Sequence, residues 1–287
     1  MDWTDRRERY RTILAGDQCV HPGSVFDPLS ARIAEDLGFE VGMFAGSVAS
    51  MSVLGDPDIV LLTLSEFAEQ AYRICRGGNL ALMVDADHGY GNALNVRRTV
   101  EELETAGVAG LTIEDTELPQ AFGTVGSTRL ISIDEGVGKM KAALDARQDS
   151  SLAIIGRTGA PQITDMDDAI ARVKAYEATG VDAIFVSGVK KLKQVEAICD
   201  AVKLPVMLGG NGSGPTDRDT LGKLGVRVSL QGHMPFMAAV QATYDTLKAL
   251  RDGTAPEDLS GVAGGDLMKS LTRNARHSQA MKDFLSD

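Results

Sequence analysis

The chain contains eight short runs of mainly apolar residues, separated by longer segments in which apolar positions recur at helical spacing. Apart from the more polar first and last, the runs hold Val, Ile, Leu, Met and small residues without polar alternation, which is typical of strands buried on both faces of a parallel sheet. They span residues 20–25, 41–45, 80–84, 110–113, 152–155, 183–186, 205–208 and 227–230. Eight strands alternating with helices favour a closed (β/α)₈ TIM barrel over an open doubly wound α/β sheet, which usually has about five or six strands.

Capping patterns support the predicted helices between these runs. Residues 65–76 carry apolar positions at helical spacing, and Thr63 with Glu66 forms a capping box at their start. Ser132 with Glu135 predicts the start of another helix in the same way. Three predicted helices end on a glycine that precedes a strand, as a left-handed C-terminal cap does: Gly107, Gly180 and Gly225.

The barrel accounts for residues from about 18 to 253 of the 287-residue chain, and we expect the whole chain, 1–287, to form one domain. A C-terminal tail, residues 254–287, follows the eighth predicted helix and contains a helical stretch near 268–284. A tail of this length beyond a complete barrel is expected to pack on a neighbouring subunit. We therefore expect a homo-oligomer.

Charge and composition exclude several classes of partner. The net charge is −11, and no cluster of Lys and Arg is present to neutralise phosphates, which argues against nucleic acid and anionic membranes. The charged N-terminus does not resemble a secretory signal, and the uncharged stretches 41–55 and 228–244 fall short of the ~20 apolar residues that a membrane span needs. Cys19, Cys75 and Cys199 are widely separated and show no disulfide or zinc spacing, so we expect a cytoplasmic protein.

Acidic residues gather where two predicted strands end, which is the face on which TIM-barrel enzymes carry their active sites. Asp85 and Asp87 follow the third run, and Glu114 follows the fourth. Carboxylates are the hard oxygen ligands that Mg²⁺ prefers, and clustered carboxylates without a cation would repel one another. The three acids therefore predict a Mg²⁺ site, with Mn²⁺ as the alternative cation, although capping of the following helices is a purely structural alternative. His88 is expected to support the loop.

Further residues at the same predicted face are candidates for binding an anionic substrate. Arg157 follows the fifth run, where its guanidinium can bind a carboxylate in bidentate geometry; a structural ion pair with Glu114 is an alternative that does not exclude this role. His233 follows the eighth run and can donate a hydrogen bond to a substrate carboxylate or serve the structure. Ser47 lies in a loop of small residues whose backbone can approach an anion or make a tight turn, and Asn211 follows the seventh run.

With these residues in place, the sequence resembles the isocitrate lyase and phosphoenolpyruvate mutase superfamily over residues 20–255. The segments that carry the resemblance are 24–32, 46–47, 85–91, 110–115 and 155–158. Within the superfamily, residues 85–96 together with Gln-Gly-His at 231–233 look most like the oxaloacetate decarboxylase branch. The resemblance implies a homotetramer.

The resemblance also implies roles for the site residues. It suggests that Asp85 holds Mg²⁺ while Asp87 and Glu114 act largely through water. It suggests equally that Ser47 binds substrate and that Arg157 and His233 hold the substrate's carboxylates.

Two comparisons with the superfamily narrow the reaction. The lyase branch carries a catalytic cysteine in the loop after the fourth strand, but here that loop, residues 116–130, has no cysteine, and neither does the whole stretch between Cys75 and Cys199. Cleavage of isocitrate or methylisocitrate is therefore disfavoured. Gly159 stands where relatives usually have Asn, Asp or Glu, and Asn211 stands where the decarboxylase branch tends to have Tyr, so these two positions leave the substrate open.

The hypothesis from the sequence is Mg²⁺-dependent decarboxylation of oxaloacetate, or of a 3-substituted analogue, to pyruvate and CO₂ through an enolate that the cation stabilises. Arg157 and His233 would be the catalytic residues, and they would bind substrate together with Ser47 and Asn211. The alternatives are another 2-oxo-acid C–C lyase or hydrolase of the same superfamily and a non-catalytic barrel that binds dicarboxylates. One barrel supports many reactions, so the fold does not choose among them.

Overall fold

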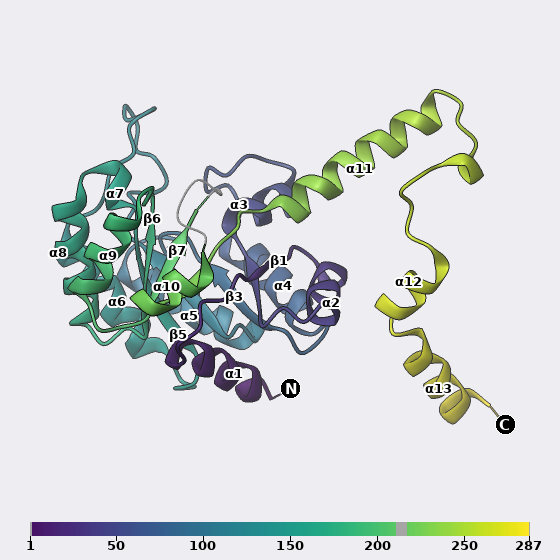
Figure 1. The fold of residues 1–287 in the computed structure, drawn as a ribbon, viewed down its shortest axis with the longest axis horizontal. Coiled ribbons are helices and arrows are strands. Elements are labelled where there is room, and N and C mark those ends of the chain that lie inside the picture. The colour runs from purple at the N-terminus through teal and green to yellow at the C-terminus, as the bar shows by residue number, and fades with distance from the viewer. Residues whose placement is uncertain (1, 211–216, 287) are drawn as a thin grey trace. The chain divides into compact units, whose positions relative to one another are not determined.

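The computed structural model describes residues 2–210 and 217–286 (Figure 1). It divides into two compact units, Met1–Gly232 and His233–Asp287. The first unit holds all eight strands, and the second is helical. That the whole chain forms one domain stays a prediction.

Eight parallel strands make up the first unit, and each pairs with its neighbour in chain order. The strands are β1 (Gly23–Ser24), β2 (Val41–Phe44), β3 (Ala81–Asp85), β4 (Gly110–Glu114), β5 (Ala153–Thr158), β6 (Ala183–Ser187), β7 (Val206–Gly209) and β8 (Val226–Ser229). Val20 links the last strand to the start of the first, because its N–H donates to the Arg227 carbonyl at 2.9 Å and its carbonyl accepts from the Ser229 N–H at 3.0 Å. The predicted α/β barrel is confirmed.

Several strands run further than the apolar runs that predict them. Asp85 and Glu114 are the last residues of their strands, and Arg157 lies within β5, whereas the sequence placed all three after the strands. A polar side chain does not end a parallel strand, because the ladder is formed by backbone groups, and Glu114 still pairs in register with Arg157. These side chains are therefore held by the sheet itself.

Helices and turns separate the strands and cover the outside of the sheet (Figure 1). They are α2 (Pro28–Asp36), α3 (Gly46–Ala49), the π-helical turn η1 (Ser50–Leu54), α4 (Leu64–Cys75), α5 (Ala93–Ala106), α6 (Ile133–Ala146), α7 (Ala160–Ile163), α8 (Met166–Glu177), α9 (Leu192–Ala201) and α10 (Arg218–Leu224). Thr63 and Glu66 form the predicted capping box before α4, and Ser132 accepts the predicted bond from the Glu135 N–H at 3.2 Å. The three predicted cap glycines all have left-handed φ angles: Gly107, Gly180 and Gly225.

The N-terminal helix α1 (Thr4–Ala15) was not predicted from the sequence. It packs against β3, β5 and β8, and its arginines donate to carbonyls that lie just before strands, such as that of Val108 before β4 and that of Leu152 before β5. The helix therefore closes the N-terminal end of the barrel. Two of its buried residues are Arg6 and Arg7, so its sequence lacks the apolar stripe by which an amphipathic helix is recognised.

Tyr10 is the residue of α1 that reaches into the N-terminal end of the barrel. Its side chain is fully buried, and its hydroxyl faces the sulfur atoms of Met83 at 3.7 Å and Met207 at 3.6 Å. A Cβ on Gly110 would lie 2.5 Å from Cε1 of the Tyr10 ring, so the absence of a side chain at this strand position makes room for the ring. The tyrosine thus fills the N-terminal end of the barrel interior.

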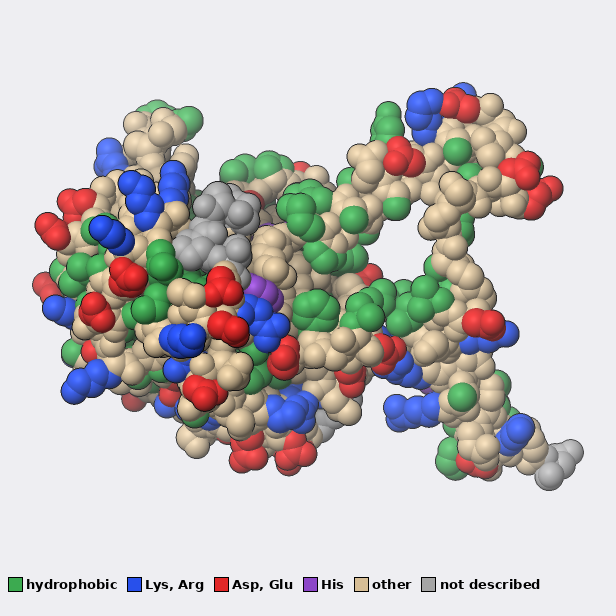
Figure 2. Space-filling view, viewed as in Figure 1, with side chains coloured by type: hydrophobic (Ala, Val, Ile, Leu, Met, Phe, Trp, Pro, Cys, Tyr) green, Lys and Arg blue, Asp and Glu red, His purple; other side chains and the backbone are tan. Residues whose placement is uncertain are grey.

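The second unit begins with the long helix α11 (Met234–Arg251), followed by the short helix η2 (Pro256–Asp258), α12 (Gly265–Leu271) and α13 (Asn274–Leu285). The stretch near 268–284 is helical as expected, but it forms two helices, with Arg273 in a left-handed conformation (φ 55°) between them. Apolar side chains are exposed along α11, as the green atoms of Figure 2 show. In the described part of the chain, no helix is long and apolar enough to cross a membrane.

Candidate active site

Three neighbouring strands bring Asp85, Glu114 and Arg157 together at their C-terminal ends. Glu114 of β4 stands in register with Arg157 of β5, and Asp85 of β3 stands in register with Thr112 of β4. The Arg157 guanidinium pairs with both acids: Nη1 with Oδ2 of Asp85, and Nη2 with Oε2 of Glu114 at 3.1 Å. Thr112 donates from its hydroxyl to the other Asp85 oxygen at 2.9 Å. The sheet register therefore orients a two-acid, one-guanidinium cluster.

Asp87 joins this cluster from the loop after β3. Its N–H donates to Oδ1 of Asp85 at 3.2 Å, and its backbone is left-handed, with φ 48°. A Cβ on Gly46 would lie 2.7 Å from both Asp87 carboxylate oxygens, so only glycine admits the carboxylate this close to the backbone of α3. Ser47 is the next residue of α3.

The cluster carries more negative than positive charge. Burial and the charges of Asp85 and Glu114 raise the pKa of Asp87 well above its usual value. Burial also raises the pKa of Glu114, although the Arg157 charge opposes this. One guanidinium thus does not compensate three carboxylates, which is the electrostatic condition that a divalent cation would relieve.

A fourth carboxylate, Asp58, belongs to this region and was not found from the sequence. Desolvation and the Asp85 charge raise the pKa of Asp58, and the Arg157 charge lowers it, so its carboxyl lies within electrostatic reach of both although the residue as a whole is exposed. Asp58 stands in an irregular segment between η1 and α4, away from any strand end. Site residues predicted from the ends of strands therefore do not include Asp58. The local sequence feature that marks this residue is the Asp-Pro-Asp motif at 56–58.

Arg157 makes the ion pair with Glu114 that was the structural alternative for this residue. Its binding of a substrate carboxylate stays a prediction. Burial by itself would lower the pKa of Arg157, but the Asp85 and Glu114 charges outweigh it and raise that pKa, which keeps the guanidinium charged. Its Nε is buried without a partner among the described residues, and its Cζ lies 5.2 Å from the centre of the Phe185 ring. No acceptor for this N–H is therefore present within residues 2–210 and 217–286.

His88 supports the loop, as expected, through its backbone. Its carbonyl accepts from the buried Lys139 ammonium at 2.9 Å, which ties the loop after β3 to α6. Burial, helped by the Lys139 charge, lowers the pKa of His88 to about 4, so the imidazole is neutral near pH 7. Its Nδ1 has no partner within the described residues.

Asp115, which follows Glu114, fixes the base of the loop at 116–131. It is fully buried and accepts from Nη1 of Arg172 at 3.1 Å and from the Tyr176 hydroxyl at 2.7 Å. Nη1 of Arg172 also donates to the Ile131 carbonyl at 2.9 Å, and the Ile131 N–H donates to the Asp115 carbonyl at 2.9 Å. Both ends of the loop are thus held on α8, and the acid at 115 is a structural residue rather than part of the cluster.

The remaining predicted residues lie elsewhere or outside the description. His233 immediately precedes α11 and is the first residue of the second unit. Asn211 lies outside the described residues. Gly159 caps the start of α7, and a Cβ there would lie 3.1 Å from Cδ1 of Ile163 and 3.4 Å from Oγ of Ser187. The structure therefore brings together Asp85, Asp87, Glu114 and Arg157, and the place of Ser47 in the site stays a prediction.

The donor set suits a cation that keeps much of its water. Within residues 2–210 and 217–286, no group of three or more His, Cys, Asp or Glu side chains converges as a complete set of metal ligands. Mg²⁺ commonly takes only about one or two direct carboxylates and fills its other positions with water. Carboxylate oxygens in excess over guanidinium charge fit such an ion in chemistry and in sign.

The sequence matches the phosphoenolpyruvate phosphomutase family over residues 12–251. The chain belongs to this family. The chain is 58% identical over 280 residues to the oxaloacetate decarboxylase of Bradyrhizobium sp. (strain ORS 278). The match covers 98% of this chain and 97% of the relative. It is 59% identical over 285 residues to the oxaloacetate decarboxylase of Rhodopseudomonas palustris (strain BisB18), with 99% of each chain covered.

A solved structure gives the same result at the level of the fold. The family member superposes on a phosphonopyruvate hydrolase in complex with oxalate and Mg²⁺ with a TM-score of 0.88 at 27% identity, over 98% of this chain and 99% of that chain. The predicted superfamily is thereby confirmed.

Proposed function

We propose that this protein decarboxylates oxaloacetate to pyruvate and CO₂. The observation that carries the proposal is the cluster of Asp85, Asp87 and Glu114 around Arg157 at the C-terminal ends of the strands. The relatives named oxaloacetate decarboxylase, 58% and 59% identical over nearly the whole chain, support the choice of substrate.

A divalent cation, Mg²⁺ or alternatively Mn²⁺, is proposed to bind at this cluster. Asp85 would hold it, with Asp87 and Glu114 acting largely through water, and the Mg²⁺ named in the phosphonopyruvate hydrolase complex supports a dication in this fold. When bound, the cation would supply a Lewis acid to the 2-oxo oxygen, where negative charge develops as CO₂ leaves.

The protein's own groups would bind and orient the substrate. The Arg157 guanidinium would bind a substrate carboxylate, and Ser47, which follows Gly46 in α3, would donate a hydrogen bond to the same anion. The bond between C3 and the leaving carboxylate breaks, the carboxylate departs as CO₂, and the electron pair of the bond passes toward the 2-oxo oxygen. When that pair returns, C3 takes a proton from water to give pyruvate. The described groups at the cluster include no thiol, and the proposed reaction needs none. It requires that the substrate be positioned and that the developing negative charge be stabilised.

Metal removal tests the proposal. Pyruvate formation from oxaloacetate, coupled to lactate dehydrogenase and corrected for spontaneous and Mg²⁺-catalysed decay, should fall to background in EDTA and return with Mg²⁺ or Mn²⁺. A parallel panel of 3-substituted oxaloacetates, 2-methylisocitrate and phosphonopyruvate separates decarboxylation from the other reactions of the superfamily. Turnover of a panel member with no turnover of oxaloacetate would reject the proposed substrate.

His233 is proposed to hold a substrate carboxylate together with Arg157. We expect His233→Ala to lower kcat/KM for oxaloacetate about 10²-fold, as the loss of one charge-orienting donor does. His277→Ala, which changes an exposed histidine of α13, is the matched control and should leave kcat/KM unchanged. Equal kinetics for the two variants would remove His233 from the site.

The protein is further proposed to form a homo-oligomer, with a tetramer as the expected size, in the cytoplasm. Large apolar side chains are exposed at helical spacing along α11: Met234, Met237, Val240, Tyr244, Leu247 and Leu250. Such a stripe on an 18-residue helix is the kind of surface that another copy of a chain covers. The three free cysteines suit a reducing compartment.

Sedimentation velocity tests the assembly. Met237→Glu combined with Tyr244→Glu should dissociate the oligomer, because each places a charge on the apolar stripe. Ala242→Glu adds a charge to the opposite side of the same helix and should leave the assembly intact. A wild-type protein that sediments as a monomer would reject the proposal.

A further inference from the structure

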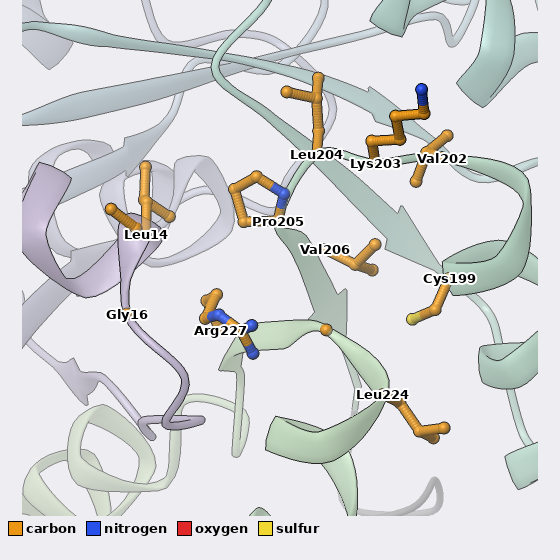
Figure 3. Close-up of a pocket in the computed structure, with 12 residues that line it drawn as sticks. Leu14, Gly16, Cys199, Val202, Lys203, Leu204, Pro205, Val206, Leu224 and Arg227 are labelled. Atoms are coloured by element: carbon orange, nitrogen blue, oxygen red, sulfur yellow. The ribbon is translucent and has the colours of Figure 1, made fainter.

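Lys139, on α6, is a buried lysine that the proposed reaction does not use. Lysine side chains are ordinarily exposed, as Lys203 is where it lines the pocket between α1, α9 and α10 (Figure 3). Lys139 by contrast is only 2% exposed. A buried ammonium is unfavourable unless the protein satisfies it, so this position requires a specific partner.

The partner of this ammonium is a backbone carbonyl rather than an acid. In the described part of the chain, no carboxylate lies within ion-pair distance of it, and it donates to the His88 carbonyl at 2.9 Å. Burial lowers the pKa of Lys139, and the charges of Glu135, Glu114 and Asp115 oppose that shift from further away. The direct contact of the ammonium is therefore with the loop after β3.

The carbonyls of residues 87–89 in this loop are each held by a different element. The first accepts from the Glu114 N–H of β4 at 2.8 Å, the second from Lys139 of α6, and the third from the buried Thr99 hydroxyl of α5 at 3.0 Å. The conformation of the loop therefore depends on hydrogen bonds from three elements that are far apart in sequence.

Two residues of this loop other than glycine have a left-handed backbone, Asp87 with φ 48° and Tyr90 with φ 59°. This conformation is unfavourable for residues that carry a side chain, so it persists only where the surrounding structure holds it. It is also the conformation in which the Asp87 carboxylate lies against Gly46. Loss of one of the three hydrogen bonds would let the loop relax and move that carboxylate.

We propose that Lys139 is a positioning residue: by holding the His88 carbonyl, it keeps the Asp87 carboxylate where a divalent cation would use it. This inference rests on the proposed function, because it takes the cluster of Asp85, Asp87 and Glu114 to be the cation site. The charge of Lys139 alone acts in the opposite direction, since a positive group within electrostatic reach of Glu114 disfavours a dication. The sign of the change in cation affinity when the ammonium is removed therefore separates positioning from a purely electrostatic effect.

Isothermal titration calorimetry of Mn²⁺ into the metal-free, full-length protein without substrate gives that sign. Lys139→Met keeps an unbranched side chain in the buried position but removes the donor. It should weaken Mn²⁺ binding about 10- to 100-fold, as loss of a group that orients metal ligands does. Mn²⁺ binding by Lys139→Met as tight as that of the wild type, or tighter, would overturn the proposal.

Two further variants complete this titration. Thr99→Val releases the neighbouring carbonyl of the same loop and should weaken Mn²⁺ binding at least about threefold. Lys141→Met is the matched control, because it changes an exposed lysine of the same helix, and it should bind Mn²⁺ as the wild type does.

Hydrogen–deuterium exchange of the peptide that covers residues 86–91, measured without metal, tests the loop itself. The Gly89 N–H donates to the Ala86 carbonyl at 2.9 Å, and this peptide should exchange at least about tenfold faster in Lys139→Met, while peptides of β6 keep their wild-type rates. A wild type that binds no Mn²⁺ would reject the cation site of the proposed function. Unchanged exchange of this peptide would overturn the role of Lys139 whether or not the cation binds.

Discussion

Asp85→Asn is expected to lower kcat/KM for oxaloacetate by at least about 10³-fold and to remove its dependence on Mg²⁺. Asp85 is the acid at which three contacts converge, from the Arg157 guanidinium, the Thr112 hydroxyl and the Asp87 N–H. Asparagine keeps the size of the side chain but removes the charge that would hold the cation. The measurement is the coupled pyruvate assay over a range of Mg²⁺ concentrations.

Two controls separate chemistry from folding in this experiment. Thr112→Val removes the hydrogen bond to Asp85 but keeps the carboxylate, so kcat/KM should fall by no more than about tenfold. The melting temperature of Asp85→Asn should stay close to that of the wild type, because relief of the repulsion from Asp87 offsets loss of the charged pair with Arg157. Pyruvate formation by Asp85→Asn at the wild-type rate, above the Mg²⁺-only background, would reject the proposed site.

Tyr10→Ala is expected to destabilise the protein by about 3–5 kcal/mol, as truncation of a fully buried aromatic side chain does. The ring closes the N-terminal end of the barrel between the Gly110 backbone and the side chains of Met83 and Met207, so its removal leaves a cavity in a close-packed interior. Urea denaturation of wild type and variant, extrapolated linearly to water, gives the difference. A loss below about 1 kcal/mol would show that α1 does not close the barrel as described.

Tyr10→Phe is the matched control. The Tyr10 hydroxyl faces only the sulfur atoms of Met83 and Met207, which are weak acceptors, so we expect a loss of less than about 1 kcal/mol. Gly110→Ala tests the same contact from the strand side, since its Cβ would lie 2.5 Å from the Tyr10 ring, and should destabilise the protein strongly.

The residues of the candidate site were predictable where each lies at the end of an apolar run. Asp85, Glu114 and Arg157 were found because a parallel barrel carries the ends of its strands to one face, whatever the sequence distance between them. Asp58 was not found, because it stands in an irregular segment whose position depends on packing. The helix α1 was missed for a related reason: two of its buried residues are arginines that bond to carbonyls far along the chain.

Local signals in the sequence alone determined the eight strands, the caps of α4 and α6 and the side of the barrel that carries the acids, because each depends on residues only a few positions apart. Only the tertiary structure decided that Arg157 pairs with Asp85, 72 positions away, that Gly46 admits the Asp87 carboxylate, and that Tyr10 closes the other end. Those contacts depend on strand register and on the space that a glycine leaves. Neither the register nor the space can be predicted from residues that are close in sequence.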